Sequence, residues 1–216
     1  MELIASTTER TTAVTDLILA LAAMVAVTVL GRRAAPSFAR RVWQAALLAA
    51  AAGAALGAAA HGLALPTETR ELLWQPLFLL LGVTVSLFVV GAVASWRGAG
   101  AASRLLLPML GVAVLFYLAT RLTGGDFLVF VLFQAGTLLF AMAVYLRLGA
   151  RGTPGAGLIA AGLAVTLAAG AVQAIDDLEV RLVWPFDHNG IYHLVQLVGL
   201  GVLTWGLTRV LPRAAA

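Results

Sequence analysis

The sequence contains no cysteine and no lysine among its 216 residues. The absence of cysteine excludes disulfides, thiolate metal sites and thiol nucleophiles. The absence of lysine excludes a Schiff base to retinal, and with it a photoactive rhodopsin. The sequence also has no GxGxxG, P-loop, GxSxG or HExxH motif, so the common forms of nucleotide chemistry and of serine and zinc proteolysis have no support.

Charge is scarce as well, since only 11% of the residues are charged, whereas 62% are hydrophobic. The mean hydropathy is +0.99, far above ordinary soluble usage, so the chain is expected to be an integral membrane protein. A formal net charge of +4 does not indicate nucleic-acid binding, because the arginines lie in short loops between apolar runs. Membrane topology accounts for that placement.

Seven apolar runs are long enough to cross a hydrocarbon core of roughly 30 Å as helices of about 20 residues. An open sheet edge cannot be satisfied in lipid, so all seven are predicted to be α-helices. We therefore expect one all-α transmembrane domain over residues 1–216, and close backbone packing of the alanine- and glycine-rich second and sixth helices. The predicted helices cover 12–31, 43–65, 75–96, 104–122, 127–146, 154–174 and 190–210.

The distribution of arginine predicts the orientation of the bundle. Ten arginines and no acidic residue fall in the connections after helices one, three and five and in the C-terminal tail. By the positive-inside rule, that side is cytoplasmic and the N-terminus is outside. The arginines of the predicted inner side are Arg32, Arg33, Arg40, Arg41, Arg97, Arg104, Arg147, Arg151, Arg209 and Arg213. The acidic residues, all on the other side, are Glu2, Glu9, Asp16, Glu68, Glu71, Asp126, Asp176, Asp177, Glu179 and Asp187.

The N-terminal tail carries acidic residues and no basic segment before the first apolar run, so we expect no cleaved signal peptide. The predicted location is a bacterial cytoplasmic (inner) membrane, with membrane lipids as partners and no nucleic acid. The oligomeric state is left open.

All three histidines are predicted to reach one level near the outer surface. His61 lies about four residues from the outer end of the second helix, roughly 6 Å deep at 1.5 Å per residue. It shares an i, i+4, i+8 stripe with Gly53 and Gly57, a spacing of small residues that is typical of a face packed inside a bundle. His188 and His193 lie at the start of the seventh helix.

Two acidic residues are expected at the same level, Asp16 in the first helix and Asp187 just before the seventh. Each of these polar residues also has a plain structural interpretation. Asp187 or Asn189 would cap the seventh helix, and Asp16 would favour the dipole of the first. A lone histidine near a helix end is most often an interfacial or hydrogen-bonded residue.

Together, the three histidines predict a metal site. Neutral imidazoles bind zinc well, and three protein ligands with one water form the catalytic arrangement. Residues five apart on a helix lie about 140° apart around its axis, at 100° per residue. We therefore expect His188 in a non-helical lead-in, turned back over His193 at Gly190. Asp16 or Asp187 is the candidate catalytic base or the residue that orients a ligand.

Seven helices with one histidine on the second and two at the seventh resemble the CREST superfamily of membrane metal hydrolases. That superfamily includes alkaline ceramidases and the progestin and adipoQ receptors. The resemblance implies a zinc ion held by His61, His188 and His193, and a zinc-activated water that hydrolyses a lipid amide or ester at the outer leaflet. This chain is then a distant bacterial relative of the superfamily.

The sequence departs from the superfamily pattern at three points. The seventh-helix pair is usually HxxxH, whereas His188 and His193 are one residue further apart. A serine four residues before the second-helix histidine is replaced by Gly57, and the third-helix aspartate has no clear counterpart. These departures leave the resemblance supporting a metal site more strongly than it supports amidase activity.

Two other functions remain open from the sequence. One is a non-enzymatic membrane sensor or an ion or proton pathway, because ionisable residues inside a membrane are functional candidates. The other is a b-type haem held between His61 and His193.

Elsewhere, Glu71 and Trp74 are expected in an interfacial segment before the third helix. Gln134 and Gln173 are expected to form hydrogen bonds between helices or to line a cavity.

Overall fold

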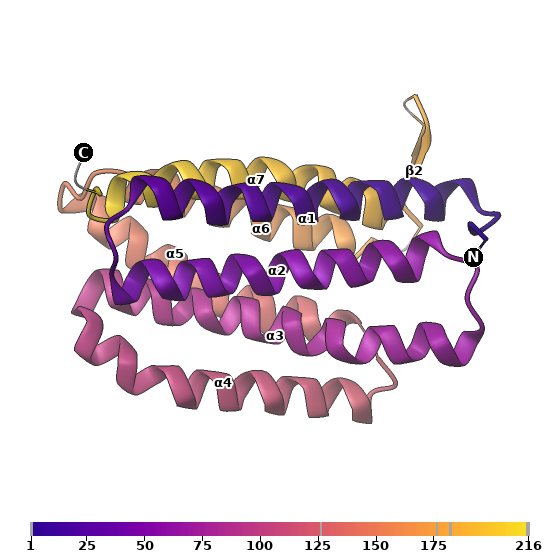
Figure 1. Cartoon of the computed structure of the whole chain (residues 1–216), viewed down its shortest axis with the longest axis horizontal. Helices are drawn as coiled ribbons and strands as arrows, with labels where there is room; N and C mark the ends of the chain where they lie inside the picture. Colours follow the sequence, from indigo (N-terminus) through magenta and orange to yellow (C-terminus); the bar gives the residue numbers. More distant parts are fainter. Residues whose placement is uncertain (1, 126, 176, 182, 215–216) are drawn as a thin grey trace.

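The computed structural model describes residues 2–125, 127–175, 177–181 and 183–214, and Asp126 and Asp176 lie outside this range. Over this range it is an all-α bundle in which seven helices are long and apolar enough to cross a membrane, as the sequence predicts. The protein is an integral membrane protein. Figure 1 shows the helices side by side, with the two termini at opposite ends of the bundle. The helices are α1 Thr7–Arg33, α2 Phe38–Gly62, α3 Thr67–Arg97, α4 Ala99–Leu122, α5 Phe127–Ala150, α6 Ala156–Gln173 and α7 His188–Val210.

The helix that differs most from its predicted bounds is α3, which begins at Thr67 rather than near residue 75. Its first two turns are polar, and the sequence analysis assigned them to a loop for that reason. Glu71 and Trp74 are therefore helical, and their expected place in a segment before the helix was wrong. The longer helix extends beyond the apolar run and brings these side chains over the end of the bundle.

Six of the helices form a ring. The neighbouring pairs around it are α1–α2, α2–α3, α3–α5, α5–α6, α6–α7 and α7–α1. Helix α4 is outside the ring and packs mainly against α3, at the edge of the bundle in Figure 1. Its outward side chains, such as Leu107 and Leu115, are 77% and 66% exposed, as expected of a surface that faces lipid. The ring is what leaves room for an interior cavity.

Glycine allows α6 and α7 to pack with their backbones in contact. A Cβ atom at Gly162 would lie 2.7 Å from the backbone nitrogen of Leu203 and 2.9 Å from the carbonyl oxygen of Gly199. At Gly206 it would lie 2.8 Å from the nitrogen of Ile159. Small residues at a helix crossing are the usual means of association in lipid, where burial of apolar surface gives little driving force. The predicted close packing of the sixth helix is confirmed.

The connection before α7 forms a small antiparallel hairpin that the sequence analysis did not predict. Strand β1 covers Glu179–Arg181 and β2 covers Pro185–Asp187, with Val180 paired to Phe186. Figure 1 shows the hairpin projecting sideways from the bundle, across the helix axes, at the end where the N-terminus lies. Strand β2 continues directly into α7.

Candidate functional site

A cavity of about 770 Å³ occupies the interior of the helix ring. Its lining changes from polar to apolar along the helices. The ionisable and amide residues of the wall include Asp16, His61, Glu71, Gln134, Gln173, His188, Asn189 and His193. The apolar residues include Leu19, Ala23, Leu47, Ala50, Ala54, Phe88, Leu138, Leu200 and Leu203. The ionisable residues thus lie at one end, near the starts of α1 and α7 and the end of α2. The interior beyond them is mostly apolar, with Thr84, Thr166 and Gln196 among its polar residues.

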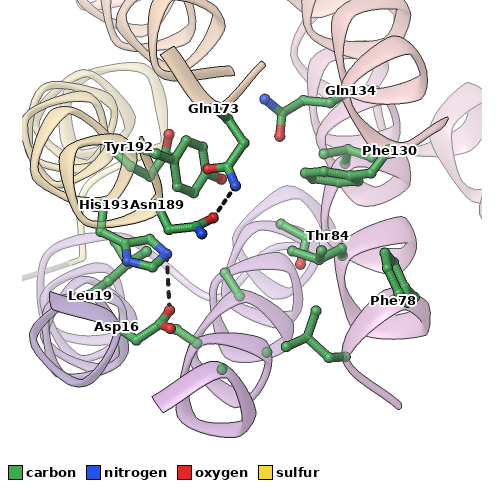
Figure 2. Close-up of a pocket in the computed structure, with 18 of the residues that line it drawn as sticks. Asp16, Leu19, Phe78, Thr84, Phe130, Gln134, Gln173, Asn189, Tyr192 and His193 are labelled. Carbon is green, nitrogen blue, oxygen red and sulfur yellow. Dashed lines mark hydrogen bonds and ion pairs between the residues drawn. The ribbon is translucent and has the colours of Figure 1, made fainter. Parts of the chain in front are cut away.

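Asp16 and His193 form a buried pair at the polar end, shown by the dashed line in Figure 2. The Nε2 atom of His193 lies 3.1 Å from the Oδ1 atom of Asp16, and the two residues are only 7% and 5% exposed. The Nδ1 atom of His193 lies 3.0 Å from the Oγ1 atom of Thr15. The Oγ1 atom of Thr15 also lies 2.9 Å from the carbonyl oxygen of Thr12, so its single hydroxyl proton goes either to that oxygen or to Nδ1.

This network dictates where a further proton must be. Whichever role Nδ1 has, the short contact between Nε2 and Oδ1 is favourable only if a proton lies between these two atoms. Asp16 and His193 thus share a proton inside the cavity wall. Such a pair can donate to or accept from a group in the cavity, which is the property that general acid–base chemistry requires.

The glycine at position 57 is what lets the carboxylate of Asp16 lie against α2. A Cβ atom there would be 2.6 Å from Oδ2 of Asp16, well inside van der Waals contact. At Gly53, one turn earlier, the nearest atom would be Leu80 Cβ at 3.7 Å, an ordinary contact. The small-residue stripe of α2 therefore faces the bundle as predicted, and it adjoins the carboxylate of Asp16 as well as a neighbouring helix.

His61 is held by partners from two other helices. Its Nδ1 atom lies 2.7 Å from the Oε2 atom of Glu9 in α1, and its ring meets the edge of Trp74 in α3, with 5.4 Å between ring centroids. The Nε2 atom, on the other side of the ring, makes no hydrogen bond to any residue in the described ranges. This matches the arrangement in which a carboxylate orients a histidine and leaves its second nitrogen available to a ligand.

Asp187 serves as the N-cap of α7. Its Oδ1 atom accepts a hydrogen bond of 2.8 Å from the backbone N–H of Gly190 and another of 2.8 Å from the hydroxyl of Thr12. Asp187 is not one of the described residues that line the cavity. The sequence offered two roles for Asp187, a helix cap and a catalytic base. The structure shows the cap, and its geometry does not support the catalytic role.

His188 is the first residue of α7, so the expected non-helical lead-in was wrong at this point. The cap by Asp187 starts the helix two residues earlier than predicted and keeps His188 from folding back over His193. His188 still lines the cavity, and its Nδ1 atom is buried with no hydrogen-bond partner among the residues that the structure describes. Asn189, the other predicted cap, instead accepts a hydrogen bond from Gln173 of α6, as Figure 2 shows.

The three histidines therefore line one cavity, but they are not arranged as metal ligands. Within the ranges that the structure describes, no group of three or more His, Asp or Glu side chains is placed to hold one metal ion. His193 is occupied at both nitrogens, and His61 and His188 approach the cavity from α2 and α7. The zinc centre at His61, His188 and His193 stays a prediction.

Comparison with known sequence families matches residues 11–212 to a family of unknown function, DUF6962. The chain belongs to this family. No curated protein and no solved structure matches it. The matched range includes all seven helices except the first four residues of α1, so the whole cavity of this DUF6962 protein lies within the family region.

The sequence analysis missed Glu9, Thr15 and Trp74 as parts of the site. Glu9, Thr12 and Asp16 follow an i, i+3, i+7 spacing, which places them on one face of α1. That periodicity was a usable signal, because it places Glu9 on the same face of α1 as Asp16 and so with the polar residues predicted at the outer level. The partners chosen by Thr15 and Trp74 depend on how α1, α3 and α7 pack, which no local pattern reveals.

Proposed function

We propose that this protein takes an amphiphilic, lipid-like molecule into the cavity of its helix ring. The observation that carries the proposal is the division of one cavity into a polar end and an apolar interior. Its volume of about 770 Å³ is in the range of sites for small-molecule ligands. An apolar interior suits a hydrocarbon chain, while the polar end suits a head group that forms hydrogen bonds.

The length of the cavity supports the same ligand class. Lining residues on α2 run from His61 to Leu47, which are fourteen residues and so roughly 21 Å apart along the helix axis. Lining residues on α7 run from His188 to Leu203, a similar distance. A chain lying parallel to the helices therefore has apolar contacts over most of its length. By the distribution of arginine, its head group would face the outer side of a cytoplasmic membrane.

A through-pathway for ions is disfavoured by the other half of the bundle. Beyond Leu47 the interior is filled by a packed cluster that includes Leu30, Trp43, Val90 and Tyr145, each at most 1% exposed. Among the described residues, the only buried aspartate and histidine are Asp16 and His193, at the other end of the bundle, and no glutamate is buried. The polar groups there, such as the Tyr145 hydroxyl paired with Ser95, are uncharged, so the energetic barrier to a desolvated ion is high.

Photocrosslinking would test whether lipid occupies the cavity. In vesicles of phosphatidylcholine doped with a phospholipid that carries a diazirine in its acyl chain, we expect adducts on the inner wall at Ala50, Ala54 and Leu203, besides the outer surface. Ala50→Phe should remove the inner adducts by filling the cavity, whereas Leu48→Phe, at a position that is 44% exposed on the outer surface, should not. Peptide mass spectrometry gives the positions. Adducts confined to outward residues such as Leu107 and Leu115 would contradict the proposal.

Zinc-dependent hydrolysis of a lipid amide or ester is the second candidate, and specific observations favour it. His61 keeps Nε2 free while Glu9 holds its Nδ1 atom, and Nδ1 of His188 is buried without a partner. His61, His188 and His193 would hold the ion, for which His193 must release Asp16. A bound zinc ion lowers the pKa of a coordinated water to about 7. Asp16, once released, is placed to accept a proton at the same end of the cavity.

Metal analysis would test this candidate directly. We expect purified protein to bind one equivalent of zinc and His61→Ala to lose it, because His61 would supply one of three ligands. Gln196→Ala, which also alters the cavity wall, serves as the control and should retain the metal. Equal zinc content in His61→Ala and the unchanged protein would exclude the assigned ligands. The same preparation shows a Soret band if the ligand is instead a b-type haem.

A further inference from the structure

The hairpin β1–β2 ends in two apolar side chains that contact little of the protein. Val183 is 80% exposed and Trp184 is 63% exposed, and both lie between the two paired strands. Figure 1 shows the hairpin leaving the bundle sideways rather than along the helix axes. Its tip thus lies beside the bundle and not above its end. A large apolar pair in that position is unlike an ordinary aqueous loop.

The base of the hairpin is fixed at a definite level of α1. The hydroxyl of Thr11, one turn into the helix, lies 2.7 Å from the carbonyl oxygen of Pro185 and 2.6 Å from that of Thr7, and its proton is shared between the two. On the exposed side of α1, the residues before this level are polar. The residues after it are apolar, beginning with Val14 and Leu17, which are 56% and 51% exposed.

The apolar side of α1 must face hydrocarbon, so the change at Thr11 marks the boundary between hydrocarbon and head groups. The hairpin leaves the bundle at that boundary and runs across the helix axes, which places its tip over the surrounding lipids. Tryptophan favours this interface because its ring is apolar and its N–H is polar. Arg181, exposed on β1, is at the level of the lipid phosphates.

We propose that the β1–β2 hairpin is a membrane-interface anchor, with Val183 and Trp184 inserted at the boundary between head groups and acyl chains. Its partner is the lipid leaflet itself. Strand β2 continues into α7 without a break, and Asp187 joins both to Thr12 of α1. The anchor therefore sets the depth of the α7 residues that line the polar end of the cavity. This inference does not depend on what the cavity binds.

The absence of cysteine allows a direct test on the full chain. Val183→Cys carries a single spin label, and the protein is placed in phosphatidylcholine–phosphatidylglycerol vesicles. Collisions with oxygen report hydrocarbon, and collisions with a water-soluble nickel chelate report water. Ala5→Cys, exposed before α1, gives the aqueous reference, and Leu115→Cys, outward on α4, gives the hydrocarbon reference.

We expect the Val183 label to collide several-fold less with the nickel chelate than the Ala5 label does, because it lies at the interface. In the Val183→Cys background, Trp184→Ala should raise nickel collisions by about twofold by removing the larger anchor, whereas Trp205→Ala, near the other end of α7, should leave them unchanged. Nickel collisions equal to those of Ala5 would overturn the proposal. So would dipolar broadening of the spectrum, which would show that a second copy of the chain covers the tip.

Discussion

Gly162→Ala is expected to lower the free energy of unfolding by about 1–3 kcal/mol, the usual cost of overpacking. A methyl group at this position meets the backbone of α7 at Leu203 and Gly199, at 2.7 and 2.9 Å. Backbone atoms cannot rotate away as a side chain can, so α6 and α7 must separate. Because these helices also carry Gln173 and His193, the separation should widen the cavity wall as well.

The matched control is Gly157→Ala in the same helix, where a Cβ atom would have nothing within 4 Å. There, alanine should be neutral or stabilising by about 0.4–1 kcal/mol, since it reduces the freedom of the unfolded chain. Both variants are measured by thermal unfolding in detergent, followed by far-UV circular dichroism and size-exclusion chromatography. Equal stability of the two variants would show that the α6–α7 contact is looser than the structure indicates.

His193→Ala is expected to lower the free energy of unfolding by about 3 kcal/mol, because it leaves the carboxyl group of Asp16 buried without the group that shares its proton. Asp16 is only 5% exposed and lies against Gly57, so water has little access to replace the imidazole. The double variant Asp16→Ala/His193→Ala should cost less than the sum of the two single variants. That non-additivity is the signature of a direct interaction.

The control for this prediction is His188→Ala, which removes the same kind of side chain from the same helix. Nδ1 of His188 has no hydrogen-bond partner in the described part of the chain, so the substitution breaks no hydrogen bond there and should cost less than half as much. Chemical denaturation in detergent, followed by at least two spectroscopic probes, gives the free energy of unfolding of the two single variants, the double variant and His188→Ala. If the single and double variants are additive, Asp16 and His193 do not share a proton.

Local patterns in the sequence predict the helices well and their ends less well. Each transmembrane run is a long apolar segment, and a membrane admits no other secondary structure for it, so the number and type of elements follow directly. The boundaries fail where helices extend past the hydrocarbon. Polar turns at the start of α3 and the cap before His188 look like loops when hydropathy is the only criterion.

The same division applies to the site. The periodicity of α2 predicts that His61 faces inward, and the charge pattern predicts the level that the histidines share. The hydrogen-bond partners of these side chains cannot be predicted in the same way, because they depend on how each helix is rotated and on the distance between helix backbones. Asp16 reaches His193 because Gly57 leaves space beside α2, and Glu9 reaches His61 because α1 is rotated to present both acids to its neighbours.

The sequence by itself therefore determined the seven helices, their predicted direction across the membrane and the gathering of the histidines at one end. These properties follow from hydropathy, charge and helical periodicity, which act over a few turns of one segment. Only the tertiary structure decided that His61 and His193, but not His188, pair with carboxylates, and that all three histidines line one cavity. Within the described residues it brings no three His, Asp or Glu side chains together around one metal position. These features arise between helices distant in sequence, where glycine contacts and capping hydrogen bonds set the spacing.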